Sequence, residues 1–344
     1  MATATGYNLI PLPVLVGHKA LAFGLLMLSV VILTSQQIFT QYAVLAHGHF
    51  LLGYWYQYKT GKFKPSVKSF GLYGIALAVC VVVLQHFPSQ FIYITAVAFA
   101  LHFLLDEFVL NTERLTVGAA LMGLPVLLIL AVGFYQHQFV AIPQALREAE
   151  LGQPMVIYNN DPGWLGQGLS LDIMPAMHQL MGPMLAGWMP VFWASFGLAV
   201  LLFFVHLWRE RRVHVFGLTM LVISAMWLLM MPGRPILDIR VLLGIIVMMH
   251  GINWYLGYDY KLRKNPQWRH VFWREIAVVN VLIIGAFALC YGLQFTRVQT
   301  AFFGFSGYHL WAMMHILTTI RRSDYGTLGR GIMVLAGRRQ AVGG

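Results

Sequence analysis

The chain has 344 residues, of which 59% are hydrophobic and 10% are charged, and its formal net charge at pH 7 is +11. Soluble domains carry about a quarter charged residues, so this composition excludes a soluble globular protein. The lysines and arginines gather in a few segments between apolar stretches. This distribution indicates orientation in a membrane rather than binding of nucleic acid.

Apolar stretches of about 18–22 residues, the length that crosses a bilayer as a helix, follow one another along the chain. We therefore predict an all-α fold, a polytopic membrane helical bundle that forms a single domain over residues 1–344. The junction TSQQIFTQ at 34–41 fits either a tight turn or a polar patch within one long helix. The ten predicted spans are 19–36, 38–58, 69–86, 90–110, 116–135, 184–207, 213–231, 237–257, 273–295 and 300–320.

Basic segments define the expected orientation. They lie in the loops 58–68, 209–212 and 261–274 and in the tail 321–344. Because Lys and Arg are enriched in cytoplasmic loops, we place these segments and both termini in the cytoplasm. The acidic loop 136–183 then lies outside, where it is suited either to cap the outer face or to contact a partner in a membrane complex. We expect an integral protein of a bacterial inner (plasma) membrane, and the sequence leaves its oligomeric state open.

Ionisable side chains lie inside several predicted spans. Counted from the cytoplasmic ends at 1.5 Å per residue, most of them share a depth in the cytoplasmic half of the bilayer, and His309 lies nearer the midplane. Such groups are costly in a membrane and usually face a bundle interior, where they find partners. The histidines are His47 and His49 in the second span, His102 in the fourth, His250 in the eighth, and His309 and His315 in the tenth.

Helical spacing separates the roles of these side chains. His102 and Asp106 are spaced i, i+4 and share one helix face, within reach of one metal centre. Glu107 points about 100° away from Asp106 and, near the cytoplasmic end of its span, is placed to reach the interface. His47 and His49 are about 200° apart on an ideal helix, so we expect only one of them to bind directly.

Imidazoles together with a carboxylate suit iron, zinc or manganese. Asp106 is then either a ligand or an outer residue that orients a ligating imidazole. Asn253 follows His250 by one turn and could bridge a ligand or a water, so we count Asp106, Glu107 and Asn253 as candidate catalytic residues. The competing interpretation is a network of hydrogen-bonded packing residues or proton-handling groups without a metal.

One segment carries a family resemblance. HFLLDEF at 102–108 resembles the His-Phe-x-x-x-Asp-Phe motif of the Brp/Blh-like membrane carotene oxygenases, with the spacing to Asp106 shorter by one residue. AHGHFLLG at 46–53 is a loose counterpart of the Pro-His-Gly-x-x-Asp element of that family, without its Pro and Asp. The resemblance implies a multi-spanning fold with histidines on several helices and an iron centre that cleaves a polyene.

The expected function is therefore that of an integral-membrane, metal-dependent oxygenase or oxidoreductase that acts on a lipophilic small molecule reaching the site from the lipid bilayer. Iron is the first choice of metal, with zinc or haem b as alternatives. Two other functions fit the same His/Asp network: a b-type haem subunit that transfers electrons, and a proton-coupled transporter or accessory membrane subunit. The sequence contains no HxxHH box and no Walker A motif, which argues against a desaturase of the histidine-box type and against an ATP-driven pump.

Overall fold

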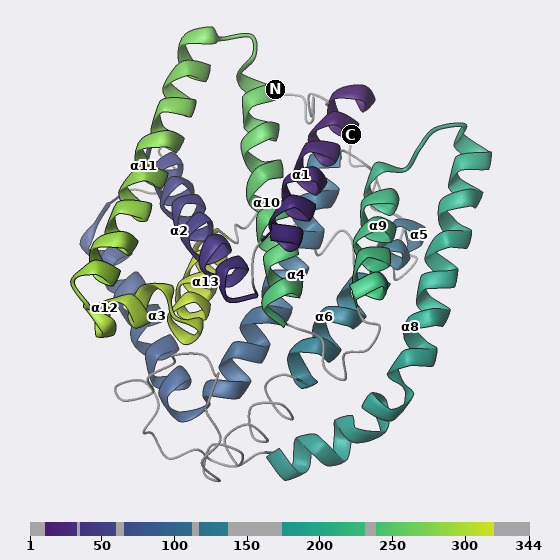
Figure 1. Ribbon diagram of the computed structural model, residues 1–344, viewed down its shortest axis with the longest axis horizontal. Helices are drawn as coiled ribbons and strands as arrows, with labels where there is room; N and C mark the ends of the chain where they lie inside the picture. Colours follow the sequence, from purple (N-terminus) through teal and green to yellow (C-terminus); the bar gives the residue numbers. More distant parts are fainter. Residues whose placement is uncertain are drawn as a thin grey trace.

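The computed structural model describes residues 11–32, 35–59, 65–111, 117–136, 174–230 and 239–319. Every regular element in these ranges is helical, so the prediction of an all-α chain is confirmed (Figure 1). The helices are α1 (Leu12–Ile32), α2 (Ser35–Lys59), α3 (Val67–His86), α4 (Pro88–Asn111), α5 (Val117–Met122), α6 (Leu124–Gln136), α8 (Met174–Glu210), α9 (Val215–Met230), α10 (Ile239–Leu262), α11 (Pro266–Gly292), α12 (Thr296–Phe303) and α13 (Phe305–Thr319).

Within the part of the chain that the structure describes, five helices are long and apolar enough to cross a membrane, which supports an integral membrane protein. The apolar segments are Leu12–Ser29, Val67–His86, Gln90–Glu107, Met189–Glu210 and Pro266–Gly292. The count of ten spans, the cytoplasmic termini and the single domain stay predictions. The tail 321–344 lies outside the described residues, as does most of the loop 136–183, but the last part of that loop belongs instead to α8, which begins at Met174.

Two predicted spans are interrupted helices. The span 116–135 is divided into α5 and α6 by a turn at Gly123, whose N–H donates to the carbonyl of Ala120 at 3.1 Å. A Cβ atom on Gly123 would lie 3.2 Å from the Phe216 ring and 3.3 Å from Leu104, so a larger residue here would require these side chains to move by a few tenths of an ångström. The span 300–320 is likewise divided, because α12 ends at Phe303 and α13 begins at Phe305.

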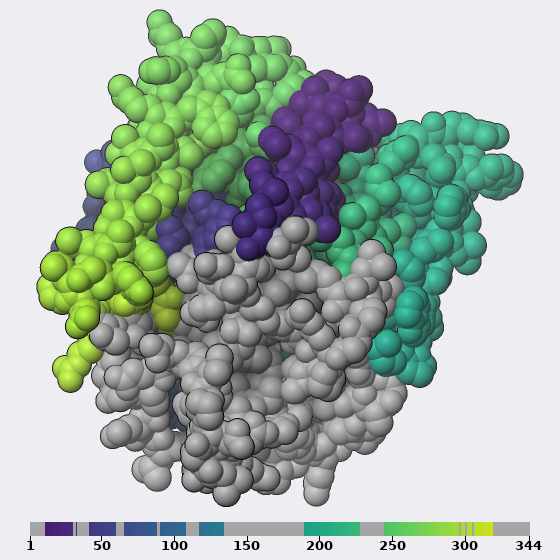
Figure 2. Space-filling view, in the orientation of Figure 1, coloured from purple at the N-terminus to yellow at the C-terminus, as the bar shows by residue number. Residues whose placement is uncertain are grey.

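Four helices surround the centre of the bundle. Among them, α10 packs against α2 and α4, and α13 packs against the same two helices. Each helix of this group therefore has two neighbours within it, and their inward faces enclose one region of the main apolar core. Helix α1 packs against α10 and runs over the face shown in Figure 2, between the green of α10–α11 and the teal of α8–α9.

Candidate metal centre

Each of the four central helices contributes one histidine to a single cluster. These residues are His49 on α2, His102 on α4, His250 on α10 and His315 on α13, and we call them the histidine cluster. Neighbouring ring centroids are 4.8 Å apart for His49 and His250, 5.0 Å for His102 and His250, 5.2 Å for His49 and His315, and 5.9 Å for His102 and His315. The four rings thus form a closed circuit in which each ring lies next to two others.

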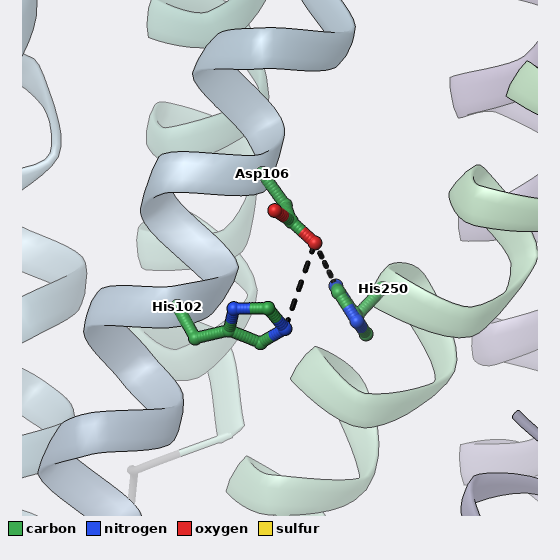
Figure 3. A group of neighbouring side chains, drawn as sticks. All are labelled: His102, Asp106 and His250. Atoms are coloured by element: carbon green, nitrogen blue, oxygen red, sulfur yellow. Dashed lines mark ion pairs between the residues drawn. The ribbon is translucent and has the colours of Figure 1, made fainter. Parts of the chain in front are cut away.

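His250 stands at the middle of the polar contacts because its two ring nitrogens face different groups. Its Nε2 lies 3.1 Å from Nε2 of His49. Its Nδ1 lies 3.6 Å from Oδ2 of Asp106, and the same oxygen is 3.6 Å from Nε2 of His102. Figure 3 shows the Asp106 carboxylate directed toward both rings from the α4 side.

Three of these residues already have the spacing of a metal site. Each of these residues offers one ligand atom, and the three atoms lie within 4.8 Å of one another; the residues are His102, Asp106 and His250. The i, i+4 relation of His102 and Asp106 follows from helix geometry, because residues four apart share a face. Bringing His250 to the same point depends on the packing of α10 against α4.

Aromatic rings pack against the cluster, and most of it is buried, although the side chains of His102 and Asp106 remain 17% and 34% exposed. His49, His250 and His315 are buried. The His315 ring stacks on Phe50 with a centroid separation of 4.6 Å, and Trp254 meets His49 edge-on at 4.9 Å. In such surroundings a polar atom without a partner is costly.

Two nitrogen atoms of the cluster test whether the site fits a metal. Nδ1 of His49 and Nε2 of His102 are buried and have no hydrogen-bond partner among the described residues. A buried donor or acceptor without a partner costs about 1–3 kcal/mol. A metal ion would satisfy Nε2 of His102 directly but not Nδ1 of His49, whose Nε2 is the atom beside His250. The unpartnered Nε2 of His102 and the neighbouring rings together make the donor set a fit for a transition metal.

Two predicted ligands lie elsewhere. The Nδ1–H of His47 donates to the carbonyl of Ala43 at 2.6 Å, and the ring packs against Phe50, Phe303 and Tyr308. His309 is buried on α13, where its ring meets that of Tyr308 edge-on at 5.4 Å. Residues two apart on a helix point to nearly opposite sides, so only one of the pair can join the cluster, and the packing of α2 makes it His49.

Glu107 and Asn253, predicted as catalytic residues, contact each other. The Asn253 side-chain amide donates to Glu107 Oε1 at 2.7 Å, and Lys19 of α1 forms an ion pair with Glu107 Oε2. The expectation that Glu107 reaches the interface is wrong, because only 1% of its side chain is exposed. Sequence reasoning missed Lys19 because it placed this residue at the end of the predicted span 19–36, whereas α1 begins at Leu12 and contains the lysine in its interior, where it needs a buried counter-ion.

Comparisons with known proteins add no relative: no family model, curated protein or solved structure matches the chain. The function therefore has to be argued from the site itself.

Proposed function

We propose that this protein is an integral-membrane, metal-dependent oxidoreductase that uses iron to act on a lipophilic substrate. The observation that carries the proposal is the convergence of four imidazoles, one from each central helix, with the Asp106 carboxylate beside them. The weak motif resemblance to membrane carotene oxygenases agrees with this class of chemistry.

The separation of the rings is suited to one ion. With metal–nitrogen bonds of about 2 Å, imidazole centroids around a common ion lie about 4.5–5.3 Å apart. Three of the four neighbouring separations, 4.8, 5.0 and 5.2 Å, fall in this interval. His102 and His315, at 5.9 Å, would have to approach slightly on binding.

Asp106 is best suited to orient the ligands. In the four-imidazole arrangement, Nε2 of His250 faces the centre beside Nε2 of His49, and Nδ1 faces Asp106. Metal-bound histidines commonly donate their other N–H to a carboxylate, which fixes the ring and raises its basicity. At 3.6 Å this contact needs only a small closure to become a hydrogen bond.

Iron in this site would supply redox and oxygen chemistry, provided that one coordination position stays open. The chain's own part is to hold the donors, to exclude water and to surround the substrate with apolar side chains. The aromatic residues Phe50, Phe99 and Trp254 contact the rings, and these apolar surroundings favour a lipophilic substrate. Haem fits less well, since opposite axial bonds of about 2 Å place the nitrogens about 4 Å apart, whereas His49 and His250 approach to 3.1 Å.

Metal analysis of the purified protein in detergent tests the proposal. We expect about one iron per wild-type chain and an iron content at least tenfold lower in His102→Ala. The visible spectrum should show no Soret band, because the proposed site holds iron without haem. The matched control is His47→Ala, which removes a buried imidazole outside the cluster and should keep its metal.

Full metal content in His102→Ala would contradict the assignment of the ligands. A wild-type protein without bound metal would contradict the metal site as a whole. That second result would favour the proton-coupled transporter, for which a buried ion pair such as Lys19–Glu107 is a usual component.

A further inference from the structure

A buried polar cluster lies beside the histidine cluster and is made by three helices. Lys19 of α1, Glu107 of α4 and Asn253 of α10 are all buried. Glu107 uses both of its oxygens, Oε2 toward the Lys19 ammonium and Oε1 toward the Asn253 amide at 2.7 Å. We call these three residues the Lys19 cluster.

The Lys19 cluster and the metal donors occupy neighbouring positions on the same two helices. Glu107 directly follows Asp106 on α4, and Asn253 follows His250 by three residues, about one turn, on α10. The two helices are thereby joined twice, once by Asp106 with His250 and once by Glu107 with Asn253. A rotation of either helix that moved one contact would also move the other.

The chemistry of the cluster favours one arrangement strongly. A carboxylate that accepts from an ammonium and an amide has both of its oxygens oriented, and such charge-assisted contacts are stronger than neutral ones. Loss of one member of a buried ion pair leaves an uncompensated charge, which destabilises a protein strongly. The Lys19 cluster is therefore able to hold α4 and α10 in a fixed rotation, with α1 supplying the balancing charge.

We propose that the Lys19 cluster positions Asp106 and His250 for the metal, and that Asn253 and Glu107 are positioning residues rather than ligands or catalytic residues. This inference rests on the proposed metal site. It assigns α1 a role in that site, although neither Lys19 nor any other residue of α1 was among the candidate ligands.

Titration of the metal-free, detergent-purified protein with Co²⁺ alone tests the inference, because the visible spectrum of Co²⁺ reports its coordination geometry. In Asn253→Leu we expect the Kd for Co²⁺ to rise by about 10- to 100-fold, with altered visible bands. The matched control is Thr95→Val on α4, which removes a buried hydroxyl whose hydrogen bond stays within its own helix, to the carbonyl of Phe91. The control should keep the wild-type Kd and spectrum.

A second variant keeps the test informative if Asn253→Leu alone fails to fold. Lys19→Met combined with Glu107→Gln removes both charges together, so that no unpaired charge is buried, and the amide oxygen of the introduced glutamine can still accept from Asn253. The Kd of this double variant for Co²⁺ should exceed the wild-type Kd by less than about tenfold. Adding Asn253→Leu to the double variant should raise the Kd by the larger factor expected for Asn253→Leu alone.

The outcomes separate the two proposals. If wild type binds Co²⁺ but Asn253→Leu, alone and in the double variant, keeps the same Kd and visible bands, the positioning role is overturned and the metal site stands. If wild type binds no Co²⁺, the metal site is overturned together with the inference that rests on it.

Discussion

Gly53 of α2 lies directly against the His315 ring. A Cβ atom at this position would lie 3.2 Å from Cε1 and 3.7 Å from Nδ1 of His315. Phe50, one turn earlier on α2, stacks on the same ring. Two residues of one helix thus help to set where the fourth imidazole of the histidine cluster stands.

We predict that Gly53→Ala weakens metal binding by about tenfold, because the added methyl group forces the His315 ring to move by a few tenths of an ångström. Residues that contact a metal ligand, without binding the metal themselves, affect metal affinity by about this factor. The Kd for Co²⁺ measures this. Gly251→Ala is the matched control, since it lies next to His250 but an added Cβ there has nothing within 4 Å. Equal losses in both variants would show that the effect comes from the helix backbone and not from His315.

At the scale of one element, α9 begins with a histidine cap. The Gly217 N–H donates to Nδ1 of His214 at 3.1 Å, a contact that requires the neutral ring. The ring is 2% exposed and stands perpendicular to that of His206, with 4.5 Å between centroids. Burial, with a smaller contribution from the charge of His206, lowers the pKa of His214 to about 4.

Stability should therefore depend on pH through this cap. The pKa of His214 is lower in the folded chain than its ordinary value of 6.5, so the unfolded chain takes up the proton first as the pH falls. The stabilisation is fully present above pH 6.5 and is lost progressively toward pH 4. We expect the Tm in detergent to fall over this interval, and to fall less in His214→Asn, which keeps a capping acceptor without titrating. The same fall in both proteins would assign the effect to other groups.

At the scale of the whole molecule, large apolar side chains face outward along the candidate spans. On α11, Val281 and Leu282 are 66% and 65% exposed. A helix with this much exposed apolar surface is suited to lipid and not to water. In contrast, most side chains of the histidine cluster and all three of the Lys19 cluster are buried inside the bundle.

A nitroxide label on Val281→Cys should therefore be relaxed strongly by dissolved oxygen and weakly by a water-soluble nickel complex, in a protein whose Cys80 and Cys290 have been replaced by Ala. Lys264→Cys, in the exposed turn between α10 and α11, should show the reverse. Power-saturation EPR in liposomes measures both. Equal access of the nickel complex to the two sites would contradict a membrane position for α11.

Several features could be predicted from the sequence because they depend on neighbouring residues. The apolar composition requires a membrane, and helical spacing alone puts His102 and Asp106 on one face. The break at Gly123 was not predicted because it lies inside an otherwise uniform apolar stretch, and the break at Gly304 was not predicted although polar residues and a second glycine lie near it. The partner of Glu107 was not predicted either, since Lys19 is 88 positions away in the chain.

The sequence by itself determined the class of the protein, the helical state of its apolar segments and the ionisable residues that they must bury, since these depend on local composition and period. Only the tertiary structure decided that His49 and His315, and not His47 and His309, join His102 and His250. It also decided that Glu107 turns toward Lys19 and Asn253. The physical reason is that the rotation of each helix about its axis is set by packing against its neighbours, which no single segment encodes.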